Sequence, residues 1–316
     1  ARDPHGLPRL LLTSRSERLM GSTITVSISH QQADQILADC FRLLRSYEHR
    51  FSANDSSSEL MEVNQKAGIE PVKVHPDLFS LIALGTSHSQ AQGSHLNIAI
   101  GPLVQTWRIG FSDARKPDQV EIEQALTVID PHQICLEPDQ QTVFLKRKGM
   151  KIDLGALAKG FSADLLASYL RSQGIEQALI DLGGNILTLG QNPVSHRPWR
   201  IGIQDPQLPR GEHLLVLSVT DKSVVTSGTY VRHLEVDGRS FHHIFDPQTG
   251  YPVETELASL TIISDRSVDG EIWTTRLFGE EPTNILNIVE TLPGMDAILV
   301  YQSGRLAYTS GLHDYL

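Results

Sequence analysis

Apolar and polar positions follow two different periods along the first part of this chain. In residues 23–28, TITVSI, the two kinds alternate, as they do in a strand with one buried face. In residues 33–51 the apolar side chains recur every three or four positions and form one stripe: Ile36, Leu37, Cys40, Phe41, Leu44, Tyr47 and Phe51. The pattern therefore predicts a half-buried strand followed by a long amphipathic helix.

The rest of the chain shows shorter patterns of both kinds. Helices are expected over residues 59–66, from Pro76 through Leu84, and over 267–278 and 283–290. Strands are expected at 143–145, 152–154, 178–182, 186–189, 199–204, 214–219, 260–263, 297–301 and 306–308. Residues 230–236 and 240–245 flank Asp237-Gly238, a sequence typical of a two-residue hairpin turn.

Helices and strands alternate irregularly in this reading, without the steady rhythm of a doubly wound sheet. This favours an α+β fold with mixed, largely antiparallel sheets and packed helices. The chain has no sequence repeat, low-complexity run or clear linker. We therefore expect an N-terminal extension over residues 1–18, followed by a single domain over residues 19–316.

Composition excludes some kinds of partner. The 316 residues are 40% hydrophobic and 20% charged, which is ordinary for a globular protein. A formal net charge of −10 argues against general nucleic-acid binding and against a polybasic membrane patch. A polyanionic ligand would need a metal ion or focused positive groups. The two cysteines, Cys40 and Cys135, form no metal-binding pattern and are expected to be thiols in a reducing compartment.

Targeting features also shape the expected location. Every apolar stretch is shorter than the roughly 18 residues of a membrane span, so no transmembrane segment is expected. The opening residues, ARDPHGLPRLLLTSRS, have too short an apolar run for a secretion signal and no lipobox cysteine. We expect a cytoplasmic protein. The alternative is a membrane-anchored lipoprotein whose signal precedes Ala1.

Residues 152–185, IDLGALAKGFSADLLASYLRSQGIEQALIDLGGN, point most clearly to a ligand. An expected strand ends at Asp153 and turns through Gly155 into a stretch of small residues that carries Lys159. Small residues let a ligand approach the backbone, and a helix start offers unpaired N–H groups to phosphate. Lys159 adds a positive charge nearby. This arrangement is typical of a site for an anionic, phosphate-bearing ligand.

Three later segments carry further candidate groups, each with a simpler alternative. Residues 223–232, SVVTSGTYVR, run into a Thr-Ser-Gly turn, and residues 241–253 contain two histidines before Asp246. Asp246-Pro247 could simply begin a turn, and only one of two adjacent strand histidines can enter a site. Glu271 and Thr275 lie i, i+4 on a predicted helix, where a carboxylate and a hydroxyl could hold Mg²⁺. A glutamate that is simply solvated is the alternative.

Taken in order, these segments resemble one family. The matching motifs are Met20-Gly21-Ser22, Ser58-Glu59-Leu60 with Asn64, Gly101-Pro102-Leu103-Val104 with Trp107, IDLGALAKGFSAD, LIDLGGNI, VTSGTYVR and HIFDPQTGYPV. They are similar to the motifs of the ApbE family, the FAD:protein FMN transferases. The resemblance runs from about Leu19 to Phe278, and it implies an ApbE-like fold.

The family's reaction cleaves FAD, releases AMP and attaches FMN through a phosphoester to a threonine of a target flavoprotein. By position, the resemblance implies that FAD is the substrate and Mg²⁺ the cofactor. His243 would contact phosphate or transfer a proton, and Asp246 is the competing base. Ala156, Glu271 and Thr275 would hold the metal. The FAD-binding residues would be Met20, Asn54, Asn97, Ile98, Ala99, Asp153, Lys159, Thr226, Ser227, Gly228, His243 and Ile244.

Two departures from the family pattern leave alternatives open. Glu271 stands where the family usually has aspartate, and a shifted alignment would make Asp269 the metal ligand. Asn54 stands where many relatives carry an aromatic residue that stacks on the flavin. Water admitted there would make the protein an FAD pyrophosphatase that gives FMN and AMP. A non-catalytic FAD-binding protein is a third reading, and the intact Lys159 and His243 argue against it.

Overall fold

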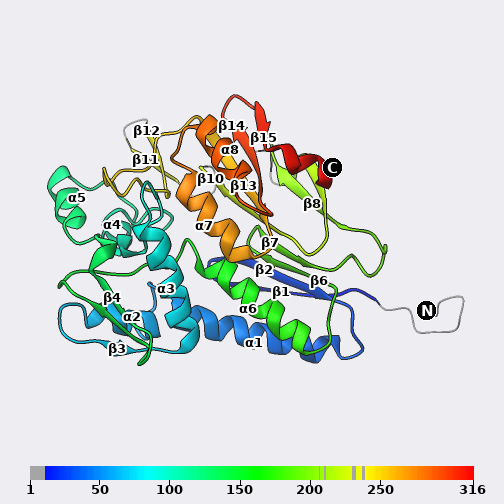
Figure 1. Cartoon of the computed structure of the whole chain (residues 1–316), viewed down its shortest axis with the longest axis horizontal. Helices are drawn as coiled ribbons and strands as arrows, with labels where there is room; N and C mark the ends of the chain where they lie inside the picture. Colours follow the sequence, from blue (N-terminus) through cyan, green and yellow to red (C-terminus); the bar gives the residue numbers. More distant parts are fainter. Residues whose placement is uncertain (1–10, 206, 210, 230–232, 237–238) are drawn as a thin grey trace, which may run out of the picture.

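The computed structural model describes residues 11–205, 207–209, 211–229, 233–236 and 239–316. Its main sheet has eight strands in the order β1-β2-β6-β7-β10-β13-β14-β15, and every neighbouring pair is antiparallel (Figure 1). The α+β prediction with largely antiparallel sheets is confirmed. The strands are β1 (Thr13–Leu19), β2 (Ser22–Ile28), β6 (Ala178–Leu182), β7 (Asn185–Leu189), β10 (Ser223–Gly228), β13 (Leu257–Ser264), β14 (Asp296–Tyr301) and β15 (Leu306–Tyr308).

Both faces of the main sheet are covered. Over one face lie α1 (Ala33–Phe51), α6 (Ala158–Ser172), α7 (Ser267–Leu277) and α8 (Pro282–Glu290) (Figure 1). The apolar stripe predicted for residues 33–51 is buried on α1 and joins Ile24, Val26 and Ile28 of β2 in one core. Alternation in β2 therefore directs its apolar side chains to the helices, as the sequence predicts.

A second, smaller layer covers the opposite face. It consists of the hairpin β8 (Trp199–Gln204) and β9 (His213–Val219) together with the 3₁₀ helix η3 (Ser310–Tyr315). Trp199 and Leu217 of the hairpin pack with Ile263 of β13 and Ile298 of β14. Leu260 and Ile262 of β13 belong instead to the core under α7 and α8.

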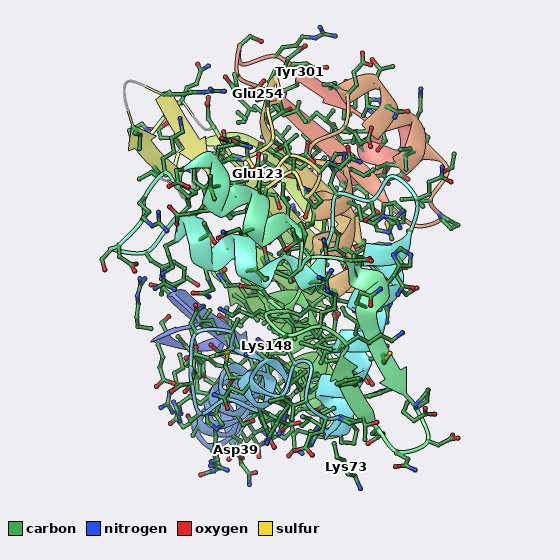
Figure 2. All side chains as sticks on the ribbon, turned by 90° about the vertical axis from the view of Figure 1, so that its left-hand side faces the viewer. Asp39, Lys73, Glu123, Lys148, Glu254 and Tyr301 are labelled. Carbon is green, nitrogen blue, oxygen red and sulfur yellow. The ribbon has the colours of Figure 1, made fainter. Side chains whose placement is uncertain are left out.

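The remaining elements surround one end of this assembly. A small sheet, β3-β5-β4, is formed by β3 (Val72–Lys73), β4 (Ile134–Glu137) and β5 (Thr142–Leu145). Beside it lie α2 (Glu59–Gln65), α3 (Pro76–Gln90), η1 (Ile98–Ile100), α4 (Gly101–Trp107), α5 (Gln119–Leu126) and η2 (Pro131–Gln133). In the view of Figure 2, α5 carries Glu123 on the side that faces the reader. The hairpin β11 (His233–Val236) and β12 (Arg239–His242) completes the fold.

One predicted strand does not form. Residues 152–154 lie outside every strand, so the prediction of a strand there is wrong. The side chain of Asn64 provides the pairing that a neighbouring strand would give. Its Oδ1 accepts a hydrogen bond from the Ile152 N–H at 2.7 Å, and its Nδ2 donates to the Ile152 carbonyl at 3.0 Å. The segment is therefore extended and hydrogen-bonded without being part of a sheet.

Other differences concern element boundaries. Residues 13–18, which the sequence analysis assigns to an N-terminal extension, form most of β1 and pair along their length with β2. Helix α5 is present where no helix is predicted. Asp118 and Glu121 form a reciprocal capping box at its start, a signal that the sequence does contain. The expected turn at Asp237-Gly238 and residues 230–232 lie outside the described residues, although β11 and β12 pair in the register of a hairpin.

Candidate functional site

One cavity gathers the chemistry-bearing segments from distant parts of the chain. Its volume is about 340 Å³, and it lies where the start of α6, helix α7, the ends of β6 and β10 and the α4 region meet. Twelve of the predicted residues line it: Asn54, Asn97, Asp153, Ala156, Lys159, Thr226, Ser227, Gly228, His243, Ile244, Glu271 and Thr275. The antiparallel order of the sheet brings β10 and β6 to this place, since β7 lies between them.

Four predicted residues are not among those that line the cavity. Ile98 and Ala99 are fully buried in η1, behind Asn97, whose Oδ1 caps η1 at the Ala99 N–H, 2.8 Å away. Met20 lies in the turn between β1 and β2, where its N–H donates to the Glu48 carboxylate. None of these three residues therefore reaches the cavity surface.

Asp246 is the fourth residue outside the lining. Its Oδ1 accepts from the Gln248 N–H at 2.8 Å, and its carbonyl accepts from the Gly250 N–H at 2.9 Å. The carboxylate is therefore used to form the turn, which is the simpler of the two readings of this segment. Between the two candidate bases, only His243 lines the cavity.

Lys159 is held at the cavity wall by close packing. Its Nζ donates to Ser22 Oγ at 3.2 Å. Gly183 adjoins both groups with a positive φ of 71°, and a Cβ there would lie 2.2 Å from Ser22 Oγ and 3.1 Å from Lys159 Nζ. Only glycine leaves room for this arrangement. Gly183 thus has a steric reason beyond its place in a loop, whereas a Cβ at Gly184 would have no neighbour within 4 Å.

Asp153 lies at the turn that leads into α6. Its Oδ1 accepts from the Gly155 N–H at 2.7 Å, and its own N–H donates to the Ile98 carbonyl at 2.8 Å. The backbone of this turn is thereby fixed against η1. Ala156, which follows, is exposed and lines the cavity, so its backbone can approach a ligand.

Glu271 is the most unusual group in the site. Its side chain is only 5% exposed, and one carboxylate oxygen, Oε1, accepts from the Asn185 side chain. The other, Oε2, is buried and has no hydrogen-bond partner among the described residues. Burial raises the pKa of Glu271 to about 8, although the Gly160 backbone N–H and the charge of Lys159 favour the ionised form. A buried carboxylate with an open oxygen beside a cavity fits a bound cation.

The neighbouring oxygens suit a hard cation as well. Thr275, one turn further along α7, and Ala156 line the same cavity as Glu271. In the described part of the chain, no three His, Cys, Asp or Glu side chains cluster in a way that would hold a metal. A cation here would therefore have one carboxylate and neutral oxygens from the protein, which leaves coordination positions for phosphate and water. That ligand set is typical of Mg²⁺.

Asp269, the alternative ligand, is differently placed. Its two oxygens accept from Arg266 at 2.8 Å and 3.1 Å, and it is not among the residues that line the cavity. The geometry therefore favours Glu271 over Asp269 as the carboxylate that a metal would meet.

Part of the cavity wall is apolar. It includes Ile100, Val104, Ile109, Phe111 and Phe245. The Arg108 guanidinium lies over the Phe111 ring, 4.1 Å from its centre. None of these residues is among the predicted site residues. Val104 belongs to the Gly-Pro-Leu-Val…Trp motif, Ile100 comes directly before it, Ile109 and Phe111 follow it, and Phe245 belongs to HIFDPQTGYPV. Such a wall suits a flat, apolar ring system.

Two polar side chains change the picture of the predicted residues. Asn54 lies at the rim of the cavity, where its Oδ1 accepts a hydrogen bond from Gln105 Nε2 at 3.5 Å. Its side chain has no aromatic ring that could stack on a flavin. Asn185 is a cavity residue that the sequence analysis does not single out. It follows Gly183-Gly184 directly in the LIDLGGNI motif, so the motif itself was the available signal.

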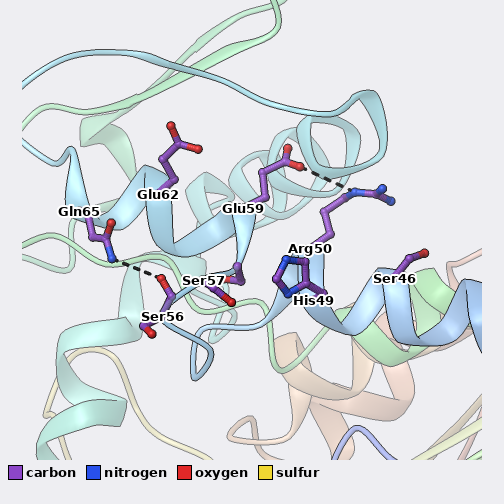
Figure 3. A pocket seen from close by; sticks show the side chains of 9 residues that line it. Ser46, His49, Arg50, Ser56, Ser57, Glu59, Glu62 and Gln65 are labelled. Carbon is purple, nitrogen blue, oxygen red and sulfur yellow. Dashed lines mark hydrogen bonds and ion pairs between the residues drawn. The ribbon is translucent and has the colours of Figure 1, made fainter.

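A second depression, between α1 and α2, is polar and lacks all the predicted groups (Figure 3). Arg50 pairs there with Glu59 at 3.8 Å, and His49 pairs with Asp55 at 3.1 Å. Gln65 donates to the Ser56 carbonyl at 3.5 Å. None of the predicted site residues lies there, so this depression is not the candidate site.

Comparisons with known proteins agree with the geometry. The profile of the ApbE family matches residues 20–299. The chain belongs to the ApbE family. An ApbE relative from Klebsiella pneumoniae (strain 342), named FAD:protein FMN transferase, is 43% identical over 298 residues, which cover 94% of this chain and 92% of that protein. A protein of the same name from Treponema pallidum (strain Nichols) is 36% identical over 98% of this chain and 90% of its own length.

Solved ApbE structures share the fold. The crystal structure of the ApbE protein from Thermotoga maritima has a TM-score of 0.88 at 24% identity, and the match covers 96% of this chain and 99% of that one. Flavin transferase ApbE from Vibrio cholerae has a TM-score of 0.84 at 24% identity, with 97% and 100% covered. The expectation of an ApbE-like fold is confirmed. In the described residues, no helix combines the length and apolar character needed to cross a membrane.

Proposed function

We propose that this chain is an FAD:protein FMN transferase, which cleaves FAD, releases AMP and attaches FMN to a threonine of an acceptor flavoprotein. One observation carries the proposal: the same cavity is lined by an apolar wall and by a buried carboxylate, Glu271. One oxygen of Glu271 has no hydrogen-bond partner among the described residues, and the charge of Lys159 acts on this carboxylate. A dinucleotide matches both features, because its flat ring system suits the apolar wall and its pyrophosphate suits the lysine and a cation held by the carboxylate. The names of the relatives at 43% and 36% identity support the same activity.

In this proposal the flavin ring lies against the apolar wall, beside Asn97 and Ile244. Asp153 and Lys159 contact the polar parts of FAD, with Lys159 opposite the phosphate charge. Thr226, Ser227 and Gly228, at the end of β10, shape the side of the cleft from which an acceptor would enter. The fixed positions of these groups orient the substrate at little entropic cost during the reaction.

Glu271, the Thr275 hydroxyl and the Ala156 carbonyl are the groups that would hold Mg²⁺. Bound there, the ion would neutralise phosphate charge and stabilise the departing AMP. The protein contributes the buried position of Glu271, which strengthens electrostatic interactions by excluding water. The longer side chain of glutamate, compared with aspartate, is oriented here by Asn185.

The transfer breaks a phosphoanhydride bond and forms a phosphoester bond. The acceptor threonine oxygen forms a bond to the FMN phosphorus, and the bond between that phosphorus and the bridging oxygen of the pyrophosphate breaks. AMP leaves with the bonding electron pair. His243, in its neutral form, takes the proton of the threonine hydroxyl. His243 is preferred to Asp246 for this role because only His243 lines the cavity.

A second candidate function follows from Asn54. An asparagine at the rim leaves the flavin side of the cavity without an aromatic cover at that position. Water that entered there would replace the threonine hydroxyl, and the products would be FMN and AMP. The same cavity would then act as an FAD pyrophosphatase.

The test is an incubation of the full chain with FAD and Mg²⁺, with and without an acceptor domain that carries a target threonine. Intact mass follows the acceptor, and chromatography follows AMP. The proposal predicts that the acceptor gains one FMN, and that EDTA prevents the gain. An acceptor in which the threonine is replaced by valine serves as the control. FAD that is bound but never cleaved would refute the proposal.

A further inference from the structure

Helix α7, which carries Glu271 and Thr275, does not cap its own first turn. Its N-cap residue, Arg266, makes no side-chain hydrogen bond to the helix N-terminus and instead pairs with Asp269. The first N–H groups of a helix have no partner within the helix, so another group must satisfy them when they are buried. Here that group comes from a different helix.

Asp164 of α6 provides the cap. One carboxylate oxygen accepts from the Ser267 N–H at 2.8 Å, and the other accepts from the Val268 N–H at 3.0 Å. Burial raises the pKa of Asp164 to about 6, while the two N–H groups favour its ionised form. The two helices are thus tied by a pair of hydrogen bonds that span 103 and 104 positions of the chain.

Gly160, one turn earlier on α6, makes a second contact with the same turn of α7. A Cβ at Gly160 would lie 2.8 Å from the Ser267 carbonyl carbon and oxygen, and 2.9 Å from the Val268 nitrogen. Both backbones therefore touch directly. These two contacts lie one turn apart on α6. Together they fix the position of α7 along the axis of α6 and its distance from that axis.

The residues of the proposed metal site lie on both sides of this contact between α6 and α7. Lys159 lies in the first turn of α6, directly before Gly160, and Ala156 lies in the turn that leads into this helix. Glu271 follows Ser267 by one turn of α7, and Thr275 follows by two. A displacement of α7 on α6 would therefore change the distance between Glu271 and the groups on the other side of the cavity.

We propose that Asp164 is a positioning residue for the metal site: it holds the first turn of α7 on α6 and so sets the place of Glu271 and Thr275. Asp164 does not line the cavity and is not itself a ligand. The inference rests on the proposed function only in taking Glu271 and Thr275 as metal ligands.

The test measures metal binding directly, with Mn²⁺ alone added to the full chain and followed by electron paramagnetic resonance. We expect Asp164→Ala to weaken Mn²⁺ binding by about tenfold, as loss of a group that orients ligands commonly does. Asp164→Asn retains one acceptor oxygen, so its effect should be smaller. It also provides a folded variant if the alanine substitution prevents folding.

Thr309→Ala is the matched control for lost stability. Thr309 is buried, donates to Asp296 at 2.7 Å, accepts from the Ala297 N–H at 2.9 Å, and is not among the residues that line the cavity. It should lower the thermal unfolding temperature without changing the Mn²⁺ affinity. Equal Mn²⁺ affinity in Asp164→Ala, Thr309→Ala and the wild type would overturn the inference. Absence of Mn²⁺ binding by the wild type would overturn it through the ligand assignment, while the FMN-transfer assay would still test the proposed activity separately.

Discussion

Glu271 shows how one residue can be arranged for chemistry at a cost to folding. A carboxylate that is 5% exposed is unfavourable without a compensating charge, and its pKa of about 8 reflects that cost. Asn185 fixes one oxygen, and the other is buried without a hydrogen-bond partner among the described residues. The arrangement is explained if the site is completed by a cation when substrate binds.

Replacing Glu271 by glutamine should separate binding from stability. The amide keeps the shape and can still accept from Asn185, but it has no negative charge. We expect AMP release to fall about 100-fold, as it does when one electrostatic stabiliser is removed. The unfolding temperature in EDTA should stay the same or rise, because folding no longer has to bury a carboxyl whose pKa burial raises to about 8. If AMP release did not change, Glu271 would not be the metal-binding carboxylate, and Asp269 would become the candidate.

Asn54 determines how well the flavin side of the cavity is closed. Its side chain is exposed, so a larger residue has room there. Asn54→Tyr should tighten FAD binding by roughly fivefold, the value of an aromatic contact of about 1 kcal/mol. It should also reduce AMP release in the absence of acceptor. Quenching of flavin fluorescence measures the affinity, and Asn54→Ala, which adds no ring, should show neither change. A tyrosine variant that binds FAD like the wild type would contradict this account of the rim.

Residue-level contacts were the least predictable part of the site. Lys159 and His243 could be selected from the sequence because the family motifs contain them, and Glu271 and Thr275 because they lie i, i+4 on a predicted helix. The hydrogen bond between Asn185 and Glu271 joins residues 86 positions apart, and no local pattern encodes such a pair. Asp246 shows the converse, since a motif residue is used to form a turn.

At the scale of elements, the junction of α6 and α7 is the feature on which the site depends. Gly160→Ala would place a methyl group 2.8 Å from the Ser267 backbone, so α7 must move. We expect a loss of about 1–3 kcal/mol in the free energy of unfolding, together with weaker Mn²⁺ binding. Chemical denaturation and the Mn²⁺ titration measure the two effects.

Ser162→Ala, on the same helix, is the control for this change. Ser162 is fully buried, and its hydroxyl has no hydrogen-bond partner among the described residues. Removing that hydroxyl should leave the stability unchanged or raise it. If Gly160→Ala behaved like Ser162→Ala in both measurements, the close contact would have no bearing on the site.

Long periodic elements and most of the short strands were predictable, and the strand that failed to form is a short one. The stripe of α1 and the alternation of β2 identify both elements because each buries one complete face. Residues 152–154 look like a strand because apolar Ile152 and Leu154 alternate with polar Asp153. They pair with the Asn64 side chain instead, which periodicity cannot distinguish from pairing with a strand.

At the scale of the whole molecule, the antiparallel sheet brings the separate motifs together. Its strand order places the ends of β6 and β10 beside the start of α6 and the face of α7. The fold class followed from the irregular alternation of helices and strands. The meeting of the motifs in one cavity did not follow from any period, and only the family resemblance suggested it.

The central claim is that this cavity passes FMN to an acceptor rather than to water. The most direct measurement is the ratio of FMN attached to acceptor to AMP released, in a single turnover with FAD, Mg²⁺ and excess acceptor domain. The account predicts one attached FMN for each AMP. Release of AMP together with free FMN, with no FMN attached to the acceptor, would contradict the account. It would identify the chain as an FAD pyrophosphatase.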